Sequence, residues 1–201
     1  ASILPVQAVP ESEPAPMPEP EAADFVRVQE YLPDILVDLK YAGAENFTGQ
    51  AVYDFTDAYL RYGTVQKLSS ALDILMDQGY TLLIWDAFRP TQAQFRLWEI
   101  CPDPVYVANP ETGFSSHSRG NTVDLTLAAL DGEPVEMPTD FDDFSPLADR
   151  DYSDVPASAA ANAQLLEDVL TACGFQPYTG EWWHFSDLDN YPVEESWSPP
   201  K

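Results

Sequence analysis

The chain has 201 residues, a formal net charge of −25 at pH 7 and an apolar fraction of 45%. Such an acidic balance repels polyphosphates and anionic lipids, so nucleic acids and membrane surfaces are poor candidates for partners. No apolar run reaches the roughly eighteen residues that a membrane-spanning helix needs. The apolar fraction is ample for a buried core. The oligomeric state does not follow from the composition.

Residues 1–24 alternate Pro, Glu and Ala and contain six of the 19 prolines. Burial in such a segment cannot offset the entropy cost of ordering it, which predicts a disordered acidic tether over 1–24 and one folded domain over 25–201. The segment lacks the basic start and apolar core of a signal peptide. Spacers of this kind are typical of exported proteins, so we expect an extracytoplasmic location. A cytoplasmic protein with an acidic start is the alternative.

The rest of the chain combines patterns of helices and strands. Helices are predicted where apolar residues recur on one face, and strands where short apolar runs or alternation occur. Helices and strands do not alternate strictly, which favours an α+β fold over a doubly wound parallel sheet. In chain order we expect a helix capped by Thr64 and stopped by Gly79, a strand over 80–85, a short helix after Pro90, a strand over 123–127, a helix from Ser158 to Gly174, and closing strands over 175–178 and 182–186.

The two cysteines, Cys101 and Cys173, are too far apart in the sequence for a CxxC zinc site. Each lies at the end of a predicted helix. Either both are small buried apolar residues or, in an exported protein, they form one long-range disulfide. The sequence leaves both possibilities open.

The two histidines of the chain each have a carboxylate close by in the sequence. His117 lies in SSHSRGNTVDLTL (115–127), seven residues before Asp124, and Gly120 between them can turn the backbone. His184 lies in TGEWWHFS (179–186). If the chain turns at Gly120 and returns along the following strand, the two imidazoles and Asp124 can meet as an N,N,O ligand set. Such a set leaves one tetrahedral position open, as in catalytic rather than structural zinc sites.

Glu181 lies three residues before His184 in an E-x-x-H pattern. On a regular strand these two side chains would point to opposite faces, but Gly180 allows an irregular entry. Glu181 could then serve as general base toward the attacking water and as acid toward the leaving amine. A surface Glu beside a core His is the alternative for this pattern taken alone.

Several stretches in family order resemble the D-Ala-D-Ala metallopeptidases, especially the vancomycin-resistance D-alanyl-D-alanine dipeptidases. The two histidine segments resemble the zinc motifs of that family. DLKYAGAENFTG (38–49) resembles its YAxxNFTG region, LLIWDAFRP (82–90) its WDxYRP motif, and FDDF (141–144) its FDxF/M element. The resemblance implies a single domain with a central, mostly antiparallel sheet flanked by helices.

The resemblance also implies one Zn²⁺ per chain on His117, Asp124 and His184, with Glu181 as catalytic base. Arg89 matches the arginine that stabilises the oxyanion of the tetrahedral intermediate, a task that suits a permanently charged planar guanidinium. An ion pair that merely fixes a neighbouring acid is the alternative for Arg89.

For the substrate, the resemblance implies that Asp142 receives the free ammonium group of a small D-amino-acid dipeptide. Ser115 and Tyr41 match further positions that contact the substrate. Asp86 is expected to orient either Arg89 or the substrate. The implied reaction is zinc-dependent hydrolysis of D-Ala-D-Ala to two D-Ala in cell-wall peptide metabolism.

Two alternatives stay open. Only 27 residues separate Arg89 from His117, fewer than expected in the best-known dipeptidases. A shorter cover over the site favours a D-Ala-D-Ala carboxypeptidase that trims muropeptides, whereas Asp142 favours the free dipeptide. The second alternative is a non-catalytic zinc-containing module that binds peptidoglycan, comparable to the Hedgehog amino-terminal domain. The presence of both Glu181 and Arg89 argues against it.

Overall fold

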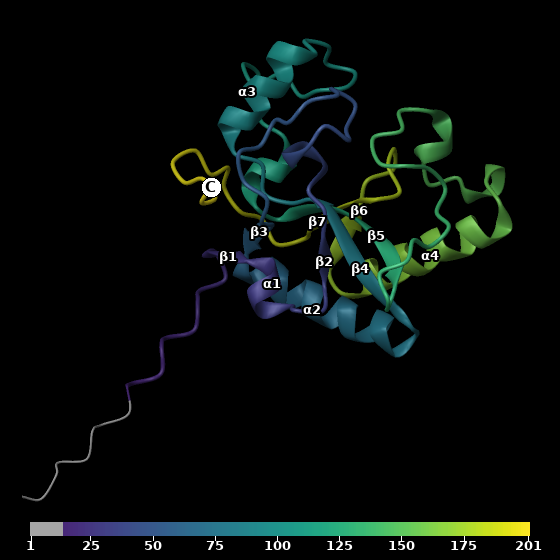
Figure 1. The fold of residues 1–201 in the computed structure, drawn as a ribbon, viewed down its shortest axis with the longest axis horizontal. Coiled ribbons are helices and arrows are strands. Elements are labelled where there is room, and N and C mark those ends of the chain that lie inside the picture. Colours follow the sequence, from purple (N-terminus) through teal and green to yellow (C-terminus); the bar gives the residue numbers. More distant parts are fainter. Residues whose placement is uncertain (1–13) are drawn as a thin grey trace, which may run out of the picture.

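The computed structural model describes residues 14–201, so the predicted tether over 1–24 lies partly outside the described residues. The first described residues project from the domain as an extended segment (Figure 1). Contacts with the domain begin at Glu19, whose Oε1 accepts a hydrogen bond of 2.5 Å from Tyr62. Ala22 follows, with its carbonyl oxygen 2.9 Å from the amide of Gly63. The packed unit therefore begins a few residues before Phe25.

The domain contains seven strands, four α-helices and four short 3₁₀ helices within the described range. The α+β class predicted from the sequence is confirmed. The elements are β1 (Phe25–Arg27), α1 (Val28–Tyr31), β2 (Leu36–Val37), η1 (Lys40–Ala42), β3 (Tyr59–Arg61), α2 (Tyr62–Asp77), β4 (Tyr80–Asp86), α3 (Thr91–Ile100), η2 (Ser116–Arg119), β5 (Thr122–Ala129), η3 (Pro146–Ala148), η4 (Tyr152–Asp154), α4 (Ala157–Ala172), β6 (Phe175–Pro177) and β7 (His184–Asp187).

The main sheet has five strands in the order β2-β4-β5-β7-β6. Only β2 and β4 are parallel; every other neighbouring pair is antiparallel, as the family resemblance implied. Strands β1 and β3 form a separate antiparallel pair. The short strands β1, β2 and β3 were not predicted, because two or three residues are too few to show a period.

Helices α2 and α4 pack against each other and against the sheet, α2 on β4 and α4 on β5 and β6 (Figure 1). Fully buried leucines from both helices and both central strands form the core between them. These include Leu68 and Leu75 of α2, Leu166 and Leu170 of α4, Leu82 of β4 and Leu125 of β5. Helix α3 lies away from this layer, in the lobe drawn above the sheet in Figure 1. No helix in the described part of the chain is long and apolar enough to cross a membrane.

One expectation about a helix end is wrong, and one open question about the cysteines is answered. Helix α2 begins at Tyr62, so Thr64 lies inside it and is not its cap. The Thr64 hydroxyl instead donates a 2.7 Å hydrogen bond to Asp187 at the end of β7. Cys101 and Cys173 do follow the last residues of α3 and α4, but both thiols are free and partly buried, so no disulfide joins them.

A buried arginine joins the segments that precede the first strand and follow the last strand. The guanidinium of Arg61 donates to the carbonyl oxygens of Ala23, Arg119 and Pro192 at 2.8, 2.9 and 2.9 Å. Its carbon also lies 4.2 Å from the centre of the Phe25 ring. The segment before β1, the end of η2 and the segment after β7 thus share one anchor.

Candidate active site

Two carboxylates and one imidazole lie in one row across the sheet. In the register of β5 with β7, Asp124 is directly opposite His184, and in the register with β4 it is opposite Asp86. Directly opposed residues of antiparallel strands point to the same face, so the row shares one side of the sheet. An irregularity between Ile84 and Asp86 shifts the register of β4 and brings Asp86 into this row.

His117 reaches the same place from η2. Gly120 ends this 3₁₀ helix with a φ of 75°, in the left-handed region, and turns the chain into β5. A Cβ at this position would lie 2.4 Å from the ring of Phe25, so the close packing also requires glycine. As a result His117 Nε2 lies 3.2 Å from Asp124 Oδ2, while its Nδ1 donates to the carbonyl oxygen of Ala87 at 2.9 Å.

His117, Asp124 and His184 present one ligand atom each within 4.8 Å of one another. Nδ1 of His184 lies 3.0 Å from Asp124 Oδ1, and the two imidazole rings meet edge to face. Asp124 Oδ1 is buried, and although His184 Nδ1 lies close to it, the pair is not aligned as a hydrogen bond, a costly arrangement unless a further group binds the oxygen. Two imidazole nitrogens with one carboxylate, and an uncompensated buried oxygen among them, fit a single divalent metal ion.

The charges around this trio favour a cation. Burial opposes ionisation of Asp124, but the neighbouring imidazoles hold the pKa of its carboxyl well below the usual range. Burial likewise disfavours a charged His117 ring, yet Asp124 and Asp86 raise its pKa to about 8. The same negative charge that holds a proton on His117 would favour a metal ion in its place.

Glu181 lies in the turn that precedes β7, beside the metal-ligand trio. Its Oε1 is 4.0 Å from Nδ1 of His184, because the chain turns at Gly180 and enters β7 only at His184. The irregular entry expected from the sequence therefore brings the two side chains together. Burial and the charge of Asp124 raise the pKa of Glu181 to about 7, which suits a group that takes up and releases a proton near neutral pH.

Arg89 is held on three sides. Its Nη2 donates to Asp86 at 2.6 Å, its Nη1 to Gln94 at 3.0 Å and its Nε to Tyr53 at 3.3 Å. Burial alone would lower the pKa of Arg89, but Asp86 and the two nearby tyrosines raise it well above the ordinary value, so the guanidinium stays charged. Asp86 is fully buried and does not line the cavity, so of the two expected roles its position favours orienting Arg89 over contacting a substrate.

Asp142 and Tyr41 form a second polar pair. The Tyr41 hydroxyl donates a hydrogen bond to Asp142, and its ring lies 5.2 Å from the guanidinium carbon of Arg89. Asp142 has a φ of 54°, the only positive value of a non-glycine residue in the described chain. Such a conformation is uncommon and is concentrated at functional sites. Burial raises the pKa of Asp142 to about 7, and no cationic side chain of the described residues forms an ion pair with this carboxyl.

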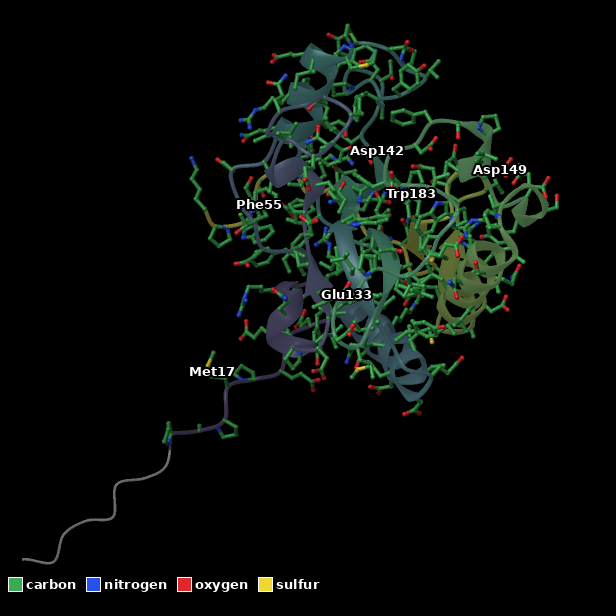
Figure 2. The ribbon with its side chains drawn as sticks, turned by 45° about the vertical axis from the view of Figure 1, so that its right-hand side comes forward. Met17, Phe55, Glu133, Asp142, Asp149 and Trp183 are labelled. Carbon is green, nitrogen blue, oxygen red and sulfur yellow. The ribbon has the colours of Figure 1, made fainter. Side chains whose placement is uncertain are left out.

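These groups line one cavity of about 370 Å³. Figure 2 labels Asp142 and Trp183 close together in its view, and the ring of Trp183 lies 5.9 Å from that of Phe141, the residue before Asp142. Except for Asp86, every site residue expected from the sequence lines this cavity: Tyr41, Arg89, Ser115, His117, Asp124, Asp142, Glu181 and His184. Ser115 also accepts a hydrogen bond from the amide of His117 at 3.2 Å, which leaves its own proton to donate.

A family model described as "D-ala-D-ala dipeptidase", of Peptidase_M15, matches residues 21–198. The chain belongs to this dipeptidase family. The D-alanyl-D-alanine dipeptidase of Escherichia coli (strain K12) is 38% identical over 175 residues, which cover 86% of this chain and 90% of the relative. The D-alanyl-D-alanine dipeptidase of Streptomyces coelicolor is 37% identical over 191 residues, which cover 81% of this chain and 91% of the relative. The resemblance seen in the sequence is thereby confirmed.

One solved structure that matches the chain is described as the structure of the LdcB LD-carboxypeptidase, which reveals the molecular basis of peptidoglycan recognition. It matches with a TM-score of 0.45 and 18% identity. The alignment covers 68% of the dipeptidase-family chain and 64% of the LdcB chain, just under two thirds.

The structure of this dipeptidase-family protein also reveals site residues that sequence reasoning missed. Tyr53 and Gln94 support Arg89 from a loop and from α3, and no motif pointed to either. At the cavity mouth, the rings of Tyr106 and Phe144 lie 4.9 Å apart, and the half-exposed ring of Tyr178 lies 5.6 Å from that of His184. The aromatic sequence neighbours of His184 did not reveal this rim, since Trp182 and Trp183 are fully buried.

Proposed function

We propose that this protein is a zinc dipeptidase that hydrolyses D-Ala-D-Ala to two molecules of D-Ala. One observation carries the proposal: a single small cavity contains the metal-ligand trio, a carboxyl suited to proton transfer, a fixed arginine and a separate carboxyl without a cationic partner. The cavity volume is near the lower end of the roughly 300–1,000 Å³ usual for ligand sites, as a small substrate requires. Relatives named D-alanyl-D-alanine dipeptidases support the substrate.

The zinc ion would be held by Nε2 of His117, Nδ1 of His184 and the carboxylate of Asp124. When bound, zinc acts as a Lewis acid that polarises a carbonyl group and makes water nucleophilic near neutral pH. The hydrogen bond from His117 Nδ1 to Ala87 orients the ring for this task.

Glu181 takes a proton from the attacking water and later donates it to the nitrogen of the departing D-Ala. Arg89 donates hydrogen bonds to the carbonyl oxygen as negative charge develops there. Its hydrogen bonds to Asp86, Gln94 and Tyr53 hold the guanidinium in place before the substrate binds, so the reaction needs no reorganisation of this group.

Asp142 would pair with the free ammonium group of the dipeptide. Tyr41 fixes the carboxylate of Asp142, and Ser115 would donate to the substrate from the neighbouring wall. A substrate whose amino group is acylated cannot form the ion pair with Asp142. This position therefore favours a free dipeptide over a longer muropeptide.

Kinetics on D-Ala-D-Ala and on N-acetyl-D-Ala-D-Ala test the proposal, with identification of D-Ala as product. We expect turnover of the free dipeptide, loss of turnover with a chelator and recovery with added Zn²⁺. Preference for the blocked peptide would indicate the carboxypeptidase alternative. Metal binding without turnover of either peptide would indicate the non-catalytic binding module.

A role in peptidoglycan metabolism follows from this substrate, because D-Ala-D-Ala ends the peptide stems of cell-wall precursors. The extracytoplasmic location stays a prediction from the composition of residues 1–24. Fractionation of cells that produce the full chain would test it.

A further inference from the structure

Arg150 lies outside the cavity lining but next to the loop that carries Glu181 and His184. This loop, residues 178–184, connects β6 to β7 and is closed by a hydrogen bond of 3.1 Å from the amide of Tyr178 to the carbonyl oxygen of His184. The amide of Glu181 donates at 3.4 Å to the carbonyl oxygen of Tyr178. Within the loop, the amide of His184 also donates at 3.4 Å to the carbonyl oxygen of Glu181, a long hydrogen bond. The carbonyl oxygens of Tyr178 and His184 thus stand at the two ends of the loop.

The guanidinium of Arg150 binds both of these oxygens. Its Nε donates to Tyr178 at 2.6 Å and its Nη2 to His184 at 2.9 Å. Nε and Nη2 form one edge of the planar guanidinium, so a single rigid group joins the two ends of the loop. The Arg150 side chain is only 9% exposed, and its carbon lies 4.7 Å from the centre of the Phe185 ring.

The backbone around Arg150 supports the same loop. The Arg150 amide donates to the carbonyl oxygen of Thr179 at 3.3 Å, and the amide of Trp182 donates to the carbonyl oxygen of Ala148 at 2.9 Å. The segment 148–150 therefore runs beside the loop and brings the guanidinium to it; Asp149, in the middle of this segment, is labelled in Figure 2. The other end of the guanidinium makes weaker contacts, 3.2 Å to the Tyr152 hydroxyl and 3.7 Å to Glu167.

We propose that Arg150 is a positioning residue that sets the distance between Glu181 and His184 by bridging the carbonyl oxygens of Tyr178 and His184. Without this bridge, the loop could open and Glu181 would lose its fixed place beside the metal ligand. The role assigned to Glu181 rests on the proposed function, whereas the placement of His184 requires only that the trio binds a metal. Residues that orient metal ligands from outside typically affect metal affinity or activity about 10–100-fold.

The test compares Arg150→Met, which keeps much of the packing on Phe185 but has no donors, with Arg150→Lys, which keeps the charge but lacks the planar pair of donors. Tyr152→Phe and Glu167→Gln are the matched controls, because they remove only the contacts at the other end. For each protein we would measure Zn²⁺ affinity by competition with a chromophoric chelator, the visible spectrum with Co²⁺, kcat and KM for D-Ala-D-Ala, and thermal unfolding.

We expect Arg150→Met to weaken Zn²⁺ binding about 10–100-fold, change the Co²⁺ spectrum and lower kcat with little change in KM. Arg150→Lys should be impaired to a smaller extent, and both controls should stay within about twofold of the parent protein in Zn²⁺ affinity and kcat. The proposal is wrong if Arg150→Met matches the parent in Zn²⁺ affinity and kcat, or if the controls lose as much.

If Arg150→Met does not fold, Arg150→Lys decides, and parental Zn²⁺ affinity, Co²⁺ spectrum and kcat in that variant would overturn the proposal. Failure of the parent protein to hydrolyse D-Ala-D-Ala would count against the proposed function. The comparison of Zn²⁺ affinities would still test Arg150, because it needs no substrate.

Discussion

The ring of His117 donates a hydrogen bond from Nδ1 to the carbonyl oxygen of Ala87, 2.9 Å away. A carbonyl oxygen can only accept, so Nδ1 carries the proton and the Nε2 lone pair is left for a metal ion. Because Ala87 precedes Arg89 by two residues, the same short segment orients a metal ligand and supplies the cation of the site.

Replacing His117 with alanine should abolish high-affinity metal binding. The variant keeps only His184 and Asp124, and two ligands are too few for a zinc site of this kind. Metal analysis after dialysis would measure the occupancy, with Ser116→Ala as a neighbouring control that should retain the metal. Full zinc occupancy in His117→Ala would refute the ligand assignment.

Glu181→Gln should have the opposite phenotype, with metal retained and turnover lost. The amide has nearly the same shape as the carboxyl but cannot accept the proton of the attacking water. We expect kcat to fall at least about 10²–10⁴-fold, the usual contribution of general acid–base catalysis. Zinc content and kcat measured on the same sample check this, and loss of zinc together with activity would show that Glu181 has a different role.

Asp142→Asn should raise KM for D-Ala-D-Ala about 10–100-fold, since a hydrogen bond to a charged group contributes about 1.5–3 kcal/mol. In the parent protein, burial raises the pKa of Asp142 to about 7, so below this pH the carboxyl is protonated and neutral. KM should therefore rise as the pH falls below about 7, and Asp142→Asn should flatten this dependence. Equal effects of the substitution on D-Ala-D-Ala and on its N-acetyl derivative would contradict the ammonium contact.

Asp86→Asn should impair both stability and turnover although Asp86 does not line the cavity. Removing one partner of a buried ion pair typically costs about 3–5 kcal/mol, and Arg89 would also lose its closest anchor. Urea denaturation and kcat would be measured beside Asp73→Asn, which changes an exposed acid on α2. A variant as stable and active as that control would show that Tyr53 and Gln94 hold Arg89 without Asp86.

Gly120→Ala should destabilise the domain by roughly 2–4 kcal/mol, because it combines backbone strain with overpacking. The new methyl group would meet the Phe25 ring at 2.4 Å at a φ of 75°. Gly49 is a matched control with a φ of 69° and no atom within 4 Å of an added Cβ, so Gly49→Ala has only the backbone cost. Equal unfolding free energies of the two variants would argue against the steric part of this explanation.

Local sequence patterns were sufficient for the longer elements and for the approach of His117 to Asp124, whereas His184 reaches them through the pairing of β5 with β7. The apolar periods of α2 and α4 and the apolar run of β4 are properties of short stretches, and the turn at Gly120 depends on a single residue. The convergence of His117 and Asp124 needed only that turn, so their spacing in the sequence was informative.

Contacts between distant segments could not be predicted in this way. Tyr53 and Gln94 meet at Arg89 from a loop and a helix separated by about forty residues, and neither has a pattern of its own. Thr64 was wrongly expected to cap a helix, because the hydroxyl finds Asp187, a partner 123 residues away. Such pairings depend on the order of strands in the sheet, which residue spacing does not encode.

The shared anchor at Arg61 has a consequence for proteolysis. One guanidinium holds carbonyl oxygens from Ala23, Arg119 and Pro192, so trimming either end of the chain past this point would remove a bond from the same group that steadies the segment next to His117. A protease that trims either end past Ala23 or Pro192 should therefore lower the free energy of unfolding and loosen the segment next to His117.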